Sequence, residues 1–394
     1  MPKPTDREKA ALFKKVAIVG VDESDEIGIV PHKSVLQLHA EAARNALADA
    51  GIDKSEVDGI FTAGAGWAAS LQIAEYLGIT PTCTDSTQVG GSSFVIHVEH
   101  AAAAIAAGLC NVALITHGET GHSNRFRQGG GRPGLDPWFP AAQFEAPYHV
   151  GGAPTVYALA CRRHMHQYGT THQQLAEIAV ATRKWAMLNP KALMREPLTI
   201  EDVLSSRWIT YPFHLYDCCL VTDAGGAVVV TSARRARDCR KVPVWVLGSG
   251  EATTHQTISQ MPDLTDTPAS ISGPRAFAMA GLTHKDIDVV EVYDSFTYTA
   301  LVTLEALGFC PKGQGGPFVS GQRTAPGGDF PLNTHGGGLS YTHPGMYGIF
   351  LLIEAARQLR GECGERQVAG ARLACVNGTG GVLSSTGTLI LGVD

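Results

Sequence analysis

The sequence predicts an α/β protein that is built from two related halves, and three observations support this fold class. Short uninterrupted apolar runs alternate with segments of helical periodicity, which is typical of sheets covered by helices on both faces. One set of short motifs occurs twice along the chain in the same order. The chain has 394 residues, of which 44% are hydrophobic, so it exceeds one ordinary core and can bury a large interior.

The apolar runs and helical segments fall into two successive groups. In the first group we expect strands at residues 16–20, 59–61, 112–116 and 227–230, and helices at residues 35–50 and 96–107. In the second group we expect strands at residues 242–247, 289–292, 372–376 and 387–391. The basic, polar stretch 233–241 lies between the groups. The sequence therefore predicts an N-terminal half over residues 1–236 and a C-terminal half over residues 237–394.

One segment of the first half has no counterpart in the second. It spans about residues 120–195 and is rich in glycine, proline, histidine and aromatic residues. Long insertions of this composition commonly carry binding or catalytic groups. We therefore expect a loop domain here, lying over the active site.

An internal repeat supports the division into halves. Two glycines that follow helical segments, and one aspartate, recur at a constant offset: Gly51 with Gly281, Gly78 with Gly308, and Asp58 with Asp288. A weaker similarity relates Gly90-Gly91-Ser92-Ser93 to Gly336-Gly337-Gly338-Leu339, because both stretches contain glycines and precede a helical segment. Matches in the same order along a chain indicate an internal duplication.

Composition excludes several classes of function. The formal net charge of −6 argues against a general nucleic-acid binder. The apolar stretches are short and interrupted by glycine and charge, so we expect no membrane span. The first residues lack the apolar core of a signal peptide, and the nine cysteines show no pairing pattern and no Cys-x-x-Cys spacing. We expect a cytoplasmic protein with reduced thiols and no bound metal.

Three stretches of the chain resemble the thiolase superfamily, most closely its sterol-carrier-protein-X and lipid-transfer-protein type. They are residues 197–219, which contain Tyr216-Asp217-Cys218-Cys219; residues 290–296, which read Val-Glu-Val-Tyr-Asp-Ser-Phe; and residues 333–345, which run from Asn-Thr-His-Gly-Gly-Gly to His-Pro-Gly. The resemblance covers essentially the whole chain. It implies a five-layered α-β-α-β-α thiolase fold made of two related halves, and a homodimer.

The chain departs from the thiolase pattern at the nucleophile. Val89-Gly90-Gly91-Ser92-Ser93 stands where a thiolase has its reactive cysteine, and Tyr293 stands where the thiolase loop has asparagine. Depending on register, Cys375 fills the place of the second catalytic cysteine or is a buried strand residue beside it. These departures resemble the thiolase-like retro-aldolases of steroid side-chain degradation. That group cleaves a β-hydroxyacyl-CoA into a ketone or aldehyde and a shorter acyl-CoA.

Retro-aldol cleavage needs a base for the β-hydroxyl proton and donors for the developing enolate oxygen, but no acyl-enzyme. Claisen cleavage needs the thiolate as acyl acceptor. We therefore expect the chemistry to rest on oxygen and nitrogen groups. The candidates are Tyr293, His343, Tyr341 as the favoured second phenol, Tyr347 as the alternative, and Asp294, which would orient a tyrosine or cap a helix.

The glycines of two loops are candidates for contact with the coenzyme A thioester. Gly337 and Gly338 lie in one loop and Gly380 and Gly381 in the other. Without a side chain, a glycine lets a backbone N–H approach a substrate carbonyl. Tight turns would need glycine as well, and both readings can hold together. His335 precedes the first glycine loop and is a weaker candidate. We expect no permanently bound cofactor, with coenzyme A present only as part of the substrate.

The resemblance also implies a partner, and two rival functions stay open. Retro-aldolases of this group work with a small zinc-ribbon and OB-fold acyl-CoA-binding protein, which implies a heterotetramer. One rival is an acyltransferase or thiolase with a displaced thiol, for which Cys83 is the candidate. The other rival is a carrier of lipids or acyl-CoA that keeps the thiolase shell without catalysis.

Overall fold

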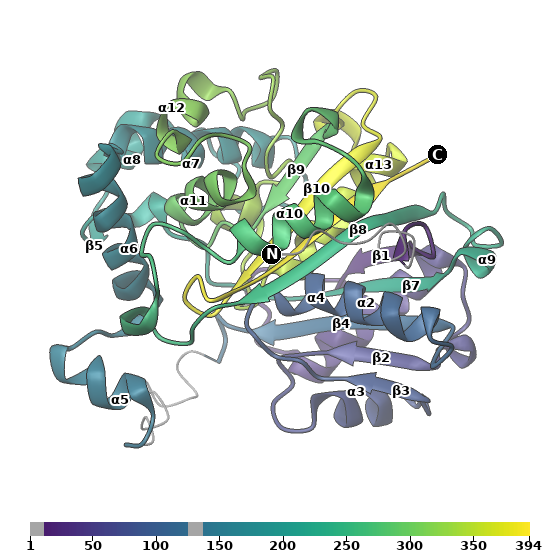
Figure 1. Ribbon diagram of the computed structural model, residues 1–394. Coiled ribbons are helices and arrows are strands. Elements are labelled where there is room, and N and C mark those ends of the chain that lie inside the picture. The colour runs from purple at the N-terminus through teal and green to yellow at the C-terminus, as the bar shows by residue number, and fades with distance from the viewer. Residues whose placement is uncertain (1–11, 125–136) are drawn as a thin grey trace.

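The computed structural model describes residues 12–124 and 137–394 (Figure 1). Residues 1–11 and residues 125–136, which belong to the predicted loop domain, lie outside the described part of the chain. Within it, nine strands form one mixed sheet in the order β3-β2-β4-β7-β1-β8-β11-β10-β9. The strands of the first half occupy one side of this order and those of the second half the other.

The first half supplies five strands of the sheet. They are β1 (Val16–Glu23), β2 (Gly59–Thr62), β3 (Cys83–Asp85), β4 (Val112–Thr120) and β7 (Asp223–Ser232). Strand β2 pairs in parallel with β3 and β4, whereas β7 is antiparallel to both of its neighbours, β4 and β1.

The second half supplies four strands with a related order. They are β8 (Val244–Thr253), β9 (Val289–Val292), β10 (Leu373–Gly380) and β11 (Ser385–Gly392). Strands β9 and β10 are parallel, and β11 is antiparallel to β10 and β8. The halves join where β1 meets β8, through the pairs Ala17–Trp245 and Ile18–Val244. A parallel bridge from Val290 to Leu332 takes the place that β3 holds beside β2.

Helices lie on both faces of each set of strands. Helix α2 (Val35–Ala50) packs on β1, β4 and β7, and α10 (Ala269–Ala280) packs on β8 and β11. Helices α4 (Ser93–Ala106) and α13 (Gly348–Arg360) contact strands of both halves and therefore lie between them. The layers follow the predicted α-β-α-β-α order, with the N-terminal strands in purple, blue and teal and the C-terminal strands in green and yellow (Figure 1).

The repeated motifs have the same structural roles in both halves. Gly51 ends α2 at φ 69°, and Gly281 ends α10 at φ 67°, a left-handed conformation that favours glycine. The Asp58 carboxylate accepts the backbone N–H of Val112 at the start of β4. The Asp288 carboxylate accepts that of Leu373 at the start of β10. The equivalent contacts explain why these residues recur.

The segment between β4 and β7 is mainly helical where the structure describes it. It contains α5 (Pro140–Phe144), α6 (Gly152–Tyr168), α7 (His172–Met187) and α8 (Ile200–Ser205), followed by the short pair β5 (Trp208–Thr210) and β6 (Phe213–His214). Helix α7 packs against α11 (Thr297–Leu307), α12 (Gly315–Val319) and the π-turn Gly337–Tyr341. The remaining α-helices within the described residues are α3 (Ala69–Leu77) and α9 (Ala233–Ala236). The boundaries of the two halves and of the loop domain stay predictions.

Several strands run further than their apolar runs predict, and β4 is the important case. Beyond residue 116 it continues through His117, Gly118 and Glu119, which pair with Gly226, Gly225 and Ala224 of β7. Gly118 and Gly225 both lie against α2: a Cβ at Gly118 would be 2.6 Å from Cδ2 of His39. Glycine at these positions lets α2 approach the sheet closely. The extended β4 then places Glu119 past the two glycines.

No helix in residues 12–124 or 137–394 is long and apolar enough to cross a membrane.

Candidate active site

Gly91, within the segment 89–93 that stands in place of the nucleophile, lies against the ring of Tyr293. A Cβ at position 91 would lie 2.5 Å from Cζ and 2.7 Å from the hydroxyl oxygen of Tyr293. Any side chain at position 91, a cysteine included, would overlap the phenol ring. The Tyr293 ring therefore leaves no space for a thiol at position 91.

The Tyr293 hydroxyl lies at the centre of three polar contacts. It is 3.0 Å from Nε2 of His343, 3.1 Å from the carbonyl oxygen of Gly345 and 3.0 Å from the backbone nitrogen of Tyr347. One arrangement satisfies all three contacts. The phenol donates its proton to Gly345, and its oxygen accepts from the Tyr347 N–H and from a protonated Nε2 of His343.

Burial keeps both Tyr293 and His343 neutral near neutral pH. Only 4% of Tyr293 and 9% of His343 is exposed. Burial raises the pKa of Tyr293 well above its ordinary value, and the nearby Glu119 carboxyl adds to this rise. Burial lowers the pKa of His343 to about 4. A neutral phenol beside a neutral imidazole forms a pair of hydrogen-bond donors rather than a strong base.

Asp294 holds the first glycine loop. Its Oδ1 accepts the Gly338 N–H at 2.7 Å, and its Oδ2 accepts the Leu339 N–H at 3.4 Å. A Cβ at Gly337 would lie 2.8 Å from Cγ of Asp294. Burial raises the pKa of Asp294 to about 7. The Gly338 N–H, a predicted donor to a substrate carbonyl, donates to Asp294 in this structure.

The second glycine loop packs directly against the loop that replaces the nucleophile. A Cβ at Gly380 would be 2.5 Å from Oγ of Ser92, and a Cβ at Gly90 would be 2.5 Å from the nitrogen of Gly381. The Gly381 carbonyl accepts the Tyr157 hydroxyl at 3.0 Å. Glycine is needed here for contact between the loops, and a role in binding coenzyme A stays a prediction.

Tyr341 lies outside the group of contacts around Tyr293. It is buried, and its hydroxyl donates to Oε1 of Glu23 at 2.7 Å. The Glu23 carboxylate also pairs with Arg357 at 2.6 Å and with Lys191 at 2.7 Å. The structure therefore places the favoured second phenol in a network of ion pairs between the first strand and α13.

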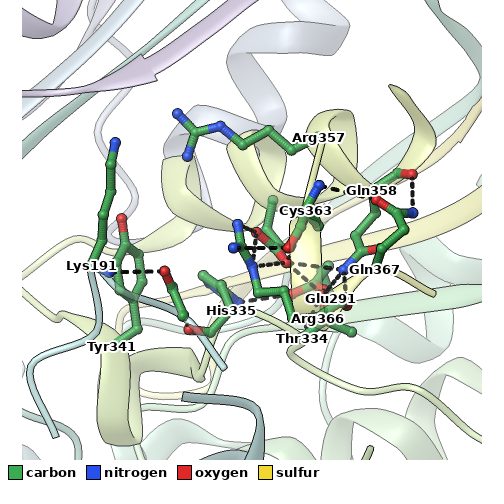
Figure 2. A network of polar contacts seen from close by, with 12 residues as sticks. Lys191, Glu291, Thr334, His335, Tyr341, Arg357, Gln358, Cys363, Arg366 and Gln367 are labelled. Carbon is green, nitrogen blue, oxygen red and sulfur yellow. Dashed lines mark hydrogen bonds and ion pairs between the residues drawn. The ribbon is translucent and has the colours of Figure 1, made fainter. Parts of the chain in front are cut away.

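Tyr347, the alternative second phenol, lies beside Tyr293. Their ring centroids are 5.4 Å apart, and Tyr347 stacks on His343 at 5.6 Å. Its hydroxyl is hydrogen-bonded to Nε2 of His335, whose Nδ1 is 3.3 Å from Oε2 of Glu291. The polar chain continues from Glu291 to Thr334 (Figure 2). The structure thus brings together Tyr293, His343 and Tyr347, with His335 behind Tyr347.

Sequence reasoning did not identify Glu119, which adjoins the same group. Its Oε2 accepts the Met346 N–H at 2.7 Å, and a Cβ at Gly345 would be 2.6 Å from its Oε1. Its side chain is 30% exposed. Burial raises the pKa of Glu119 to about 7. The available signal was a carboxyl just past a buried apolar run, where parallel strands end at a common edge.

The cysteines do not offer an activated thiol in its usual place. Cys375 is fully buried in β10, where it pairs with Ile390 and Val290, and burial raises the pKa of its thiol to about 12. Of the two alternatives for Cys375, a second catalytic cysteine or a buried strand residue, the structure shows a buried strand residue. Cys83 begins the edge strand β3. Cys219 adjoins the site, because its N–H donates to the Ser295 carbonyl at 2.9 Å, but burial raises the pKa of its thiol as well.

Comparison with known proteins agrees with this geometry. Residues 250–393 match the family model described as "Thiolase C-terminal domain-like". The chain is 35% identical to the 17-hydroxy-3-oxo-4-pregnene-20-carboxyl-CoA lyase of Mycobacterium tuberculosis, over 97% of this chain and 100% of that protein. It is also 35% identical to the steroid side-chain-cleaving aldolase of Thermomonospora curvata, over 92% of this chain and 94% of that protein.

A solved structure is similar along nearly the whole chain. It is described as the Ltp2-ChsH2(DUF35) aldolase, and it superposes with a TM-score of 0.88 at 34% identity, over 97% of this chain and 99% of that chain. The sequence prediction of a thiolase fold is confirmed by the strand order, the layers and these matches. The chain belongs to the thiolase superfamily, alongside the steroid side-chain-cleaving lyases that it matches from end to end.

Proposed function

We propose that this protein is a lyase that cleaves a carbon–carbon bond in a β-hydroxyacyl-CoA by a retro-aldol reaction. The observation that carries this proposal is the position of the Tyr293 ring, which leaves no space for a side chain at Gly91 in the loop that stands in place of the nucleophile. The two curated relatives are named as a steroid CoA-ester lyase and a steroid side-chain-cleaving aldolase. The substrate we propose is a steroid side-chain CoA ester, cleaved to a ketone or aldehyde and a shorter acyl-CoA.

The group around Tyr293 suits the charge that develops in this reaction. When the bond between the α- and β-carbons breaks, its electron pair moves into an enolate whose oxygen is the former thioester carbonyl. Neutral donors held in a buried site stabilise such an oxygen strongly, because no water has to reorganise around it. The Tyr293 hydroxyl and the His343 imidazole are 3.0 Å apart and both neutral. We assign them to hold the enolate oxygen.

The same residues make a thiolase reaction a poor fit. Claisen cleavage requires a nucleophile that accepts the acyl group. Position 91 has no side chain and no space for one. The thiol that adjoins the site, Cys219, has its pKa raised by burial, which disfavours the reactive thiolate.

Product analysis tests the proposal. The purified protein is incubated with a steroid β-hydroxyacyl-CoA and with the matching β-ketoacyl-CoA plus free coenzyme A, and products are identified by mass spectrometry. We expect a steroid ketone and a shorter acyl-CoA from the first substrate, and no turnover of the second. Thiolytic cleavage of the β-ketoacyl-CoA, or binding of both without any cleavage, would instead support the thiolase or the carrier.

We further propose the assembly that the family resemblance implies. The solved relative is described by two protein names, one of them marked DUF35, which supports a complex with a small zinc-ribbon and OB-fold acyl-CoA-binding protein. Strand β3 lies at the edge of the sheet, and an edge strand offers unpaired backbone groups to a second copy. We propose a homodimer that binds two such partners in the cytoplasm. Co-purification and scattering of the co-expressed chains test this stoichiometry.

A further inference from the structure

Glu119 and Tyr293 are held side by side by three consecutive residues. The Gly345 carbonyl faces the Tyr293 hydroxyl at 3.1 Å, the Met346 N–H donates to Glu119 at 2.7 Å, and the Tyr347 N–H contacts the Tyr293 hydroxyl at 3.0 Å. Gly345 has φ 144°, and a Cβ there would meet the Glu119 carboxyl. The backbone at this point therefore aligns a carboxyl with the phenol.

One oxygen of Glu119 remains available for a ligand. Oε2 accepts the Met346 N–H, whereas Oε1 accepts no hydrogen bond within residues 12–124 and 137–394. The side chain is 30% exposed, in contrast to Tyr293, of which 4% is exposed. The carboxyl is thus the more accessible member of the pair. The Met346 N–H fixes the group through one oxygen and leaves the other free to come within hydrogen-bond reach of a substrate proton, as a general base must.

Few charged groups face Glu119. His117, from the same strand, has Nε2 at 3.6 Å from Oε2, and burial lowers the pKa of this imidazole well below its ordinary value, so it carries no charge near neutral pH. Tyr293 and His343, from the two facing loops, are neutral as well. No lysine or arginine forms an ion pair with Glu119 in the part of the chain that the structure describes.

We propose that Glu119 is the general base that removes the proton from the β-hydroxyl of the substrate. This inference rests on the proposed retro-aldol reaction and identifies a group that neither the sequence motifs nor the named relatives assign. The carboxylate takes the hydroxyl proton, the oxygen forms the new carbonyl of the ketone, and the bond to the α-carbon breaks. Its electron pair enters the enolate, and the carboxylic acid then returns the same proton to the α-carbon, so that Glu119 ends as it began.

The alternative base, a phenolate, is disfavoured by the same surroundings. Burial raises the pKa of both Tyr293 and Tyr347 well above their ordinary values. Burial raises the pKa of Glu119 only to about 7, so its carboxylate is well populated near neutral pH and is also more basic than an ordinary one. A base whose pKa lies near the working pH is the most effective in proton transfer.

The variant Glu119→Gln tests this assignment, with Glu201→Gln as the matched control on the exposed start of α8. Glutamine keeps an oxygen for the Met346 N–H but cannot take a proton. We expect kcat to fall by about 100-fold or more, with little change in KM and in the thermal midpoint. Glu201→Gln should retain wild-type turnover.

The pH profile separates a base from a residue that only supports the loop. In the wild type we expect kcat/KM to fall as pH decreases through about 7, because protonation removes the base. Glu119→Gln should lose this acid limb, whereas Tyr293→Phe should keep it at a lower rate. Full activity of Glu119→Gln, or an unchanged acid limb in its residual activity, would overturn the assignment of Glu119 as the base. The proposed retro-aldol function would stand. A wild-type protein that cleaves no β-hydroxyacyl-CoA would overturn the proposed function, and this role with it.

Discussion

Tyr293 and Tyr341 are both buried tyrosines in thiolase-like loops, yet the structure gives them different surroundings. The Tyr293 hydroxyl contacts a neutral imidazole and two backbone groups. The Tyr341 hydroxyl donates to the Glu23 carboxylate, which is itself paired with Arg357 and Lys191. Burial raises the pKa of both phenols. Burial is therefore common to both sites, and the partners of each hydroxyl decide which tyrosine is free to meet a substrate.

The difference also separates catalysis from stability. A hydroxyl that satisfies a buried carboxylate stabilises the fold, since an unsatisfied partner would cost about 1–3 kcal/mol. A hydroxyl that adjoins a partly exposed carboxyl and a neutral imidazole can exchange partners with an incoming thioester. Four experiments, from the largest expected effect to the smallest, sharpen or break this comparison.

Tyr293→Phe should have the largest effect on turnover. The change removes the proposed donor to the enolate oxygen while keeping the ring beside Gly91. We expect kcat to fall by about 100-fold or more, with the circular dichroism spectrum and assembly unchanged. Near wild-type turnover would remove Tyr293 from the mechanism.

Gly91→Ala should disturb both folding and turnover, because its methyl group would overlap the Tyr293 ring. Overpacking of this kind destabilises a core by about 1–3 kcal/mol. Urea unfolding of Gly91→Ala, Tyr293→Ala and the double variant measures their coupling. The double variant should be more stable than the sum of the single changes predicts. Strict additivity would contradict a steric conflict between a side chain at position 91 and the Tyr293 ring.

Tyr341→Phe should act on stability far more than on turnover. The Glu23 carboxylate loses one hydrogen bond but keeps both cations, so we expect a loss of about 1–3 kcal/mol in the free energy of unfolding. Steady-state rates should stay within a few-fold of wild type. A hundredfold loss of kcat in a folded variant would restore Tyr341 to the chemistry, as the sequence pattern alone suggested.

Cys219→Ala and Cys83→Ala should have the smallest effects. Neither thiol is required if no acyl group is transferred to the protein. We expect turnover to be retained in both variants, and intact-mass analysis during turnover to find no acyl adduct on any cysteine. Loss of activity in one of them, together with an adduct that disappears in that variant, would favour the displaced-thiol enzyme.

The sequence predicted most of the fold because the relevant patterns are local. The strand β9 was predicted at its observed bounds, as was the helix α2. Gly51 and Gly281 mark helix ends through their own backbone conformation, and Asp58 and Asp288 act on strands of the same half. Such signals need no knowledge of distant contacts, so a duplicated chain shows them twice.

The site was only partly predictable, and two residues show why. Tyr341 and Tyr347 are six positions apart. The π-turn ends at Tyr341 and α13 begins after Tyr347, so the backbone between them has no regular period. No pattern of spacing therefore indicates which phenol faces Tyr293. Glu119 was missed because the apolar run of its strand ends earlier, and the strand continues only through its pairing with β7.

The sequence alone indicated a duplicated α/β chain, since composition, periodicity and motif order are properties of the chain itself. Its resemblance to thiolases added the family and the absence of a thiol in the segment 89–93. The tertiary structure decided which groups meet. It placed the Tyr293 ring over Gly91, set Tyr341 against Glu23 and brought Glu119 to the Gly345–Tyr347 segment. These contacts join residues far apart in sequence, and only packing of the two halves against the shared helices α4 and α13 fixes them.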